Sequence, residues 1–169
     1  MLILADDVGR VINPNGKTPE QLLIQDERTQ PVKVNAFGLF DIPMSPQLAQ
    51  VNPRMVGEPP APILKLGLAI VIRLPAEGLP DLALLKEGVQ QTNAVMLARA
   101  RVAPERVPQA VGVTLRFPSA DRAVVAVLRN GEWQSMQADE EGRLDLPLDE
   151  TVSELRIPQM PLIIFPLFP

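Results

Sequence analysis

The chain contains no cysteine, no histidine and no tyrosine among its 169 residues. The absence of cysteine excludes a disulfide framework, and the absence of both cysteine and histidine excludes thiolate and imidazole metal sites. Histidine is the usual base that activates a serine nucleophile, and no Ser-x-x-Lys or Gly-x-Ser-x-Gly spacing replaces it. The sequence therefore predicts a protein that is not an enzyme, with no catalytic residue, no metal and no cofactor.

Long apolar runs and clusters of basic residues are absent as well. The longest apolar runs are Ile63–Ile72, interrupted by Lys65, and Pro161–Pro169, whereas a membrane-spanning helix needs about 20 residues. The net charge is -4 and the 16 basic residues are scattered, while nucleic-acid binding requires clustered Lys and Arg side chains. We expect neither a membrane span nor a nucleic-acid partner.

Proline, by contrast, is abundant, with 19 copies spread through the chain. This distribution favours many short strands ended by turns over a helical bundle. Two segments rich in proline and polar residues, 45–62 and 150–161, are predicted to be loops, and Asn130-Gly131 is the strongest hairpin signal. Alternation and strand-like composition predict strands at residues 20–25, 32–34, 63–74, 111–117, 123–129 and 162–168.

One segment, residues 77–101, has a helical pattern. Pro80 suits the first helical position, and Leu82, Leu85 and Val89 recur at spacings of three and four. The pattern predicts a single helix of roughly five turns.

A strand motif occurs twice in the chain. Gly38-Leu-Phe-Asp-Ile-Pro43 and Gly142-Arg-Leu-Asp-Leu-Pro147 lie 104 positions apart. In the second copy Leu144 and Leu146 point to one side of a strand and Asp145 to the other. Each copy is predicted to be a half-buried strand that follows a glycine turn and ends at proline.

The 104-residue offset extends beyond this motif without gaps, and the order of turn signals is the same in both halves. Further agreements at the same offset are Pro14 with Pro118, Leu22–Ile24 with Ala126–Leu128, and Gln30 with Gln134. We predict a mainly β protein of two small antiparallel β-sandwich-like units, 1–75 and 108–169, related by internal duplication and joined by a helical segment, 76–107. Chance similarity between two generic β segments is the alternative.

The order of these motifs resembles a proteobacterial family of uncharacterised, typically exported proteins. The resemblance covers nearly the whole chain and rests on strand and turn residues, namely Gly38–Pro43, Asn52-Pro53, Gln90–Ala94, Glu132-Trp133 and Leu146-Pro147. It implies two similar β-rich halves with a connecting helix, and a periplasmic or envelope location with any leader removed. It transfers no functional residue, and the composition alone suits a cytoplasmic protein equally well.

Two kinds of carboxylate site are conceivable. Asp41 and Asp145 form the obvious pair for acid–base chemistry, but residues that face solvent on alternating strands are the simpler interpretation. Asp6-Asp7 and Asp139-Glu140-Glu141 offer hard oxygen ligands for calcium. Neither has the spacing of a recognised calcium loop, so solvated turns are expected.

Two apolar features complete the candidate sites. Trp133, the only tryptophan, has a ring suited to stacking on a sugar or peptide, although a core residue that closes the end of a β unit is the preferred interpretation. The segment Leu162–Phe168 is either an exposed edge that pairs with another chain or a strand paired within its own half. We expect the second.

These observations lead to a function hypothesis. The chain is expected to be a non-enzymatic envelope module with a structural or protein-binding role, whose partner is another protein or a second copy. The alternative is a periplasmic carrier or sensor that binds a small apolar or sugar ligand between the two β units near Trp133. A third hypothesis is a hydrolase that uses Asp41 and Asp145.

Overall fold

A computed structural model describes residues 5–11, 21–25, 30–35, 37–40, 54–58, 66–118 and 122–169. The chain divides into an N-terminal unit, Asp7–Ala69, and a C-terminal unit made of Met1–Asp6 and Ile70–Pro169. The described strands form three antiparallel sheets, accompanied by one α-helix. The prediction of a mainly β protein is therefore confirmed.

The N-terminal unit is built around strand β2, which pairs with β3 on one side and β5 on the other. Strand β1, whose first two residues belong to the C-terminal unit, pairs with β4. Leu22 and Phe40 are buried together, with Val32 and Val34 packed against them. The strands are β1 (Ala5–Val11), β2 (Gln21–Gln25), β3 (Gln30–Lys33), β4 (Leu39–Phe40) and β5 (Arg54–Glu58).

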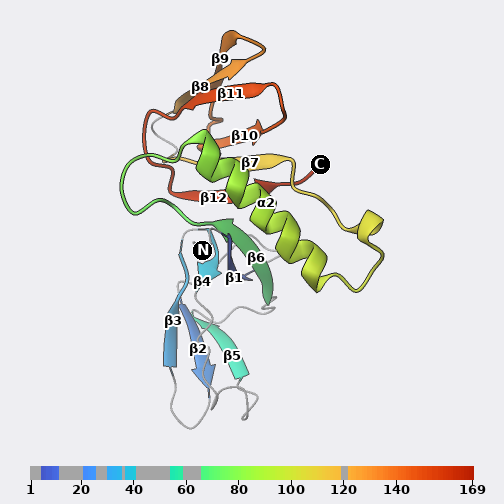
Figure 1. Cartoon of the computed structure of the whole chain (residues 1–169). Helices are drawn as coiled ribbons and strands as arrows, with labels where there is room; N and C mark the ends of the chain where they lie inside the picture. Colours follow the sequence, from blue (N-terminus) through green and yellow to red (C-terminus); the bar gives the residue numbers. More distant parts are fainter. Residues whose placement is uncertain are drawn as a thin grey trace. The chain divides into compact units, whose positions relative to one another are not determined.

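The C-terminal unit contains two sheets (Figure 1). One has the strand order β10-β7-β12-β6, and the other has β8 between β9 and β11. Strand β6 (Leu66–Ile72) begins in the N-terminal unit. The other strands are β7 (Gly112–Arg116), β8 (Val124–Arg129), β9 (Glu132–Gln137), β10 (Arg143–Pro147), β11 (Val152–Arg156) and β12 (Ile163–Leu167).

Both sheets of the C-terminal unit and the helix contribute to one hydrophobic core. Along β8, Val125 and Val127 are fully buried whereas Val124 is 47% exposed, so only one face of this strand enters the core. The buried members of the core are Ile72, Leu85, Val113, Leu115, Phe117, Ala123, Val125, Val127, Ala138, Leu144, Leu146, Val152, Ile157 and Ile164.

Helix α2 (Leu82–Arg99) contacts β7, β11 and β12 and buries Leu85 in the core. It begins after Pro80, because the Asp81 side chain accepts a hydrogen bond from the Leu84 N–H at 2.8 Å and caps the first turn. The predicted helix is confirmed with shorter ends. The sequence assigned residues 76–107 to a connecting segment, whereas the compact C-terminal unit includes them.

The two glycine turns of the repeated motif have the same hydrogen bonds. Before β4, the Asn35 Oδ1 accepts the N–H groups of Phe37 and Leu39 at 2.9 and 3.0 Å, and Gly38 has φ of +75°. Before β10, the Asp139 Oδ1 accepts the N–H groups of Glu141 and Arg143 at 3.0 and 2.7 Å. Gly142 there has φ of +76°. Both turns match the prediction of a glycine turn that leads into a strand.

Two predicted loops each contain a strand. Segment 45–62 contains β5 and segment 150–161 contains β11. In β11 a bulge between Val152 and Glu154 breaks the alternation of period two that marks a strand in the sequence. Each strand is stabilised by pairing with a strand that is distant in the sequence: β5 pairs with β2, and β11 pairs with β8.

Two local predictions agree with the structure. Asn130 and Gly131 have φ of +51° and +81° and join β8 to β9 as a two-residue hairpin. The C-terminal strand β12 is paired with β7 inside its own half, with Ile164 opposite Leu115, but it also pairs with β6 of the predicted first half, with Ile164 opposite Ile72.

Candidate functional site

Trp133 lies on the outer face of the sheet β11-β8-β9. The β8–β9 register places it opposite Leu128, and Leu128 in turn lies opposite Glu154 on β11. The Trp133 side chain is 44% exposed, so the prediction that it closes a core is wrong. The physical reason is that the core already receives the other face of β8, which carries Val125 and Val127.

Arg156 of β11 covers part of Trp133. Its guanidinium carbon lies 4.2 Å from the centroid of the Trp133 ring, a distance suited to a cation–π interaction. Two nitrogens of the same guanidinium, Nε and an Nη, donate to the Glu154 carboxylate at 3.1 Å. The tryptophan is thereby held in one orientation on the sheet surface by a charged neighbour that is itself fixed.

The outer face of this sheet is an apolar strip with a polar margin. Val124 is 47% exposed, and Ala126 and Leu128 are half-buried beside Trp133. The name Trp133 face is used below for Val124, Ala126, Leu128, Trp133, Ser135, Gln137, Glu154 and Arg156. The sequence indicates only Trp133 of this group as a candidate, because the composition of β11 predicts a loop.

Asp145 is engaged in a hydrogen-bonded ion pair. The Arg143 Nε and Nη2 donate to its carboxylate at 3.0 and 2.7 Å, and the Thr114 hydroxyl donates at 2.6 Å. The hydrogen bond from Arg143 is the largest effect on the pKa of this carboxyl and lowers it. Desolvation, which raises the pKa, comes second, and the hydrogen bond from Thr114 adds a further lowering, so the net shift is downward. A general acid needs a raised pKa, so this carboxylate is unsuited to that role. Asp41, its predicted partner, lies outside the described residues.

The acidic turn Asp139-Glu140-Glu141 has structural interactions. The Asp139 carboxylate caps the turn through the two backbone N–H groups given above, and Glu141 lies 4.0 Å from the Arg116 guanidinium. The described residues contain no group of three or more acidic side chains that could hold a metal ion. Asp6-Asp7 lies within strand β1 and not in the predicted turn.

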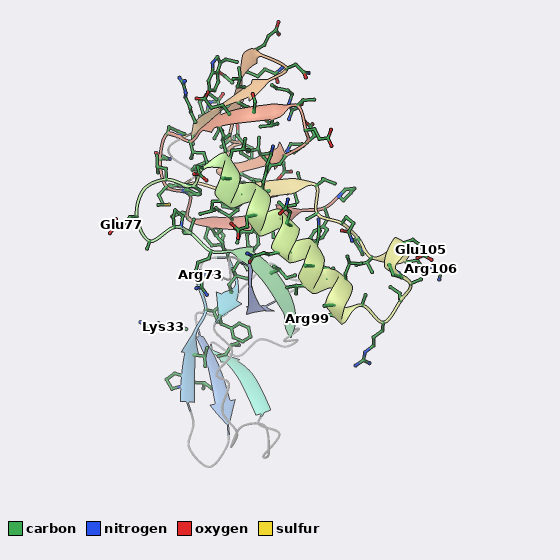
Figure 2. The ribbon with its side chains drawn as sticks, viewed as in Figure 1. Lys33, Arg73, Glu77, Arg99, Glu105 and Arg106 are labelled. Atoms are coloured by element: carbon green, nitrogen blue, oxygen red, sulfur yellow. The ribbon has the colours of Figure 1, made fainter. Side chains whose placement is uncertain are left out.

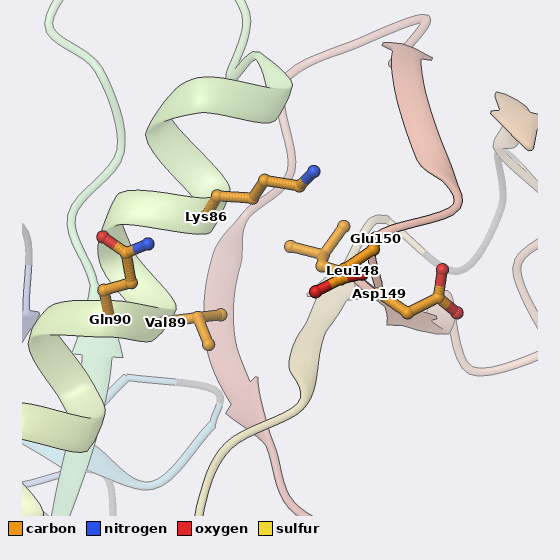
Figure 3. A pocket seen from close by; sticks show the side chains of 6 residues that line it. All are labelled: Lys86, Val89, Gln90, Leu148, Asp149 and Glu150. Atoms are coloured by element: carbon orange, nitrogen blue, oxygen red, sulfur yellow. The ribbon is translucent and has the colours of Figure 1, made fainter.

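A small pocket lies between α2 and the connection from β10 to β11 (Figure 3). Its volume of about 210 Å³ is below the roughly 300–1,000 Å³ of usual ligand sites. Two of the three charged groups at its wall are already bonded: the Lys86 amine donates to the Val152 carbonyl at 3.0 Å, and Asp149 accepts from the Thr151 N–H. The six lining residues are Lys86, Val89, Gln90, Leu148, Asp149 and Glu150.

Basic side chains of the C-terminal unit come from separate elements. Arg73 follows β6, Arg99 ends α2, and Arg106 belongs to the short 3-10 helix η1 (Pro104–Arg106) (Figure 2). The absence of a nucleic-acid partner stays a prediction.

Comparison with known proteins adds no identity. The chain matches no family model, no curated protein and no solved structure. Within the described part of the chain, no helix is both long enough and apolar enough to span a membrane.

Proposed function

We propose that this protein is a non-enzymatic binding module that recognises a protein partner through the Trp133 face. The observation that supports this is the exposed Trp133 ring, held by Arg156 on a regular sheet. Tryptophan and arginine are enriched among the residues that contribute most to protein interfaces. A fixed aromatic side chain also loses little conformational entropy when a partner covers it.

The shape of the face favours a protein over a small ligand. It is the outer surface of a sheet, and Arg156 already lies over one side of the Trp133 ring. The pocket beside α2 does not include Trp133. The alternative is a carrier or sensor that binds a small apolar or sugar ligand near Trp133. Such a ligand, added alone, should change the fluorescence of this single tryptophan.

The absence of an enzyme activity is part of the proposal. It rests on a sequence without histidine or cysteine and on the lowered pKa of Asp145. Turnover of ester, peptide or glycoside libraries that disappears in Asp145→Asn would contradict it.

The test compares two exposed apolar residues of the C-terminal unit. Trp133 is 44% exposed and Leu97, on α2, is 43% exposed. Each protein is used to capture partners from extracts of the native cells. We expect the wild type and Leu97→Ala to capture the same proteins, and Trp133→Ala to capture none of them. Their binding should also shift the Trp133 emission, because no other tryptophan contributes. Equal capture by all three proteins would overturn the proposal.

We also propose a periplasmic or envelope location. Its support is the resemblance of the motif order to exported proteobacterial proteins. Fractionation of the native cells with an antibody against the chain tests it, and recovery in the cytoplasmic fraction alone would contradict it.

Finally, we propose that the two halves are sandwich-like units that arose by duplication. Strand β2 lies between β3 and β5 as β8 lies between β9 and β11, and the β1–β4 pair corresponds to β7–β10. The equivalent caps by Asn35 and Asp139 add support. The offset does change along the chain: Leu22 pairs with Val32, whereas its counterpart Ala126 pairs with Ser135.

The change is one position, because the 104-residue offset would place Met136 opposite Ala126, where Ser135 is found. A crystal structure tests the duplication. Residues 5–72 and 112–167 should superpose strand for strand, and a different strand order in the first half would rule it out.

A further inference from the structure

Among the described strands, β9 lies at the edge of its sheet, and the hydrogen-bonding groups that it turns away from β8 can be assigned. It ends the order β11-β8-β9, and the Ala138 N–H donates to the Ala123 carbonyl at 2.9 Å, in register with the β8–β9 pairing. In an antiparallel pair, every second residue bonds to the neighbouring strand. The N–H and C=O groups of Trp133, Ser135 and Gln137 therefore point away from β8.

This edge lacks the features that usually prevent strand addition. Natural edge strands carry prolines, bulges or charged side chains. Strand β10, the edge of the other sheet in this unit, contains Pro147 and the Arg143–Asp145 ion pair. Strand β11 has a bulge and the Glu154–Arg156 ion pair. Beyond its first residue, β9 reads Trp-Gln-Ser-Met-Gln and is uncharged.

Negative charge lies at both ends of this open edge. Glu132 begins β9, and Glu140 lies in the turn that follows it. Among the described residues neither carboxylate has an ion pair, whereas the nearby Arg143 and Arg156 are paired with Asp145 and Glu154. A strand placed along β9 thus meets an uncharged centre between two unpaired carboxylates.

We infer that β9 accepts an extended segment of a partner protein as an added strand, and that this segment carries Lys or Arg on both sides of an uncharged, apolar centre. The inference rests on the proposed function and specifies its partner. Backbone hydrogen bonds to the free groups of β9 provide affinity, and the ring of Trp133 selects an apolar side chain. The unpaired carboxylates select the basic flanks.

A second copy of the chain is a poorer occupant. In an antiparallel pair of two β9 strands, the Glu132 end of each lies against the Asp139–Glu141 end of the other. Like charges then meet at both ends, which is unfavourable across a strand pair.

Synthetic peptides test the inference on the full chain. The probe is a labelled peptide of about nine residues, long enough to span the strand, with alternating valine and threonine and a lysine pair at each end. The first control replaces the lysines by glutamates, and the second methylates alternate backbone nitrogens so that they cannot donate. We expect the lysine peptide to bind, and each control to bind at least about tenfold more weakly.

Variants of β9 provide the second arm. Ser135→Pro removes only an outward N–H, so the pairing with β8 is retained while strand addition is blocked. Ser135→Ala keeps that N–H and is the matched control. The paired change Glu132→Gln and Glu140→Gln should weaken binding of the lysine peptide and reduce its dependence on salt. Thermal unfolding by circular dichroism shows which variants remain folded.

The outcomes separate the two proposals. One outcome would overturn strand addition and leave the Trp133 face as a binding site. In it, Trp133→Ala abolishes binding, Ser135→Pro does not change it, and the methylated peptide binds as tightly as the unmethylated one. Binding that is lost in Ser135→Pro but unchanged in Trp133→Ala would contradict the role of the Trp133 ring in the proposed function while leaving strand addition in place. A dimer in sedimentation that Ser135→Pro abolishes would identify a second copy as the occupant and overturn the cationic partner.

Discussion

The guanidinium carbon of Arg156 lies 4.2 Å from the centroid of the Trp133 ring. The two residues belong to β11 and β9, the outer strands of one three-stranded sheet, and meet over Ala126 and Leu128 of the central strand. Their interaction therefore links the two edges of the sheet on its exposed side.

This contact should be measurable as a coupling energy. A double-mutant cycle with Trp133→Leu and Arg156→Met is expected to give about 0.5–1 kcal/mol, the usual value for an exposed cation–π pair. Urea unfolding followed by circular dichroism measures it, because the tryptophan itself is removed. Additivity of the two single changes within about 0.3 kcal/mol would show that the stacking contributes nothing.

Two turn glycines should respond differently to alanine. Gly131 has φ of +81° with open space around an added Cβ, so Gly131→Ala should cost about 1 kcal/mol from backbone strain alone. Gly142 has φ of +76° and its added Cβ would overlap the Phe117 carbonyl oxygen. We expect Gly142→Ala to cost at least about 3 kcal/mol. Denaturant unfolding of both variants checks the order, and equal losses would contradict the steric argument.

Gly88 of α2 should be coupled to Ile72 of β6. An alanine Cβ at position 88 would lie 2.7 Å from the Ile72 Cγ2, an overlap that costs about 1–3 kcal/mol in a packed core. Combining Gly88→Ala with Ile72→Ala should therefore destabilise by at least about 1 kcal/mol less than the sum of the single changes. The control pairs Gly88→Ala with Val127→Ala, on β8, and should be additive within about 0.5 kcal/mol.

The Asp145 carboxylate should contribute to acid sensitivity. Its pKa is lowered in the folded protein, chiefly by the hydrogen bond from Arg143 and then by that from Thr114. A group with a lowered folded pKa contributes stability above its ordinary pKa of about 3.9, and this contribution is lost as the pH falls through the folded pKa. Because the Asp145 side chain is 40% exposed, solvent screening limits the effect to under about 1 kcal/mol.

The measurement is the urea midpoint between pH 6 and pH 2. Asp145→Asn should reduce the fall in stability below pH 4, relative to the wild type. The control is Glu140→Gln, which removes a carboxylate without an ion pair among the described residues. An identical pH profile for the wild type and Asp145→Asn would show that the ion pair contributes nothing to stability.

Much of the local structure could be predicted from short sequence patterns. Asn130-Gly131 indicated its hairpin because few residue pairs adopt positive φ twice in succession. Gly38 and Gly142 indicated turns because glycine adopts a positive φ most readily. Strands β5 and β11 could not be predicted, since both lie in segments rich in proline and polar residues, and a bulge interrupts the alternation of β11.

The position of Trp133 shows what the sequence alone can determine and what depends on the tertiary structure. The sequence by itself determined the hairpin and the residues that alternate along β8 and β9. It did not determine which side of β8 faces the core, because both sides are apolar: Val125 and Val127 on one, and Val124, Ala126 and Leu128 on the other.

Only the tertiary structure decided this. The buried side of β8 belongs to one hydrophobic core with residues of β7, β10 and α2, and the side that carries Trp133 is left exposed with Arg156 above the ring. The physical reason is that burial is a property of the neighbouring sheet and helix, which supply the contacting atoms, and not of the strand's own pattern.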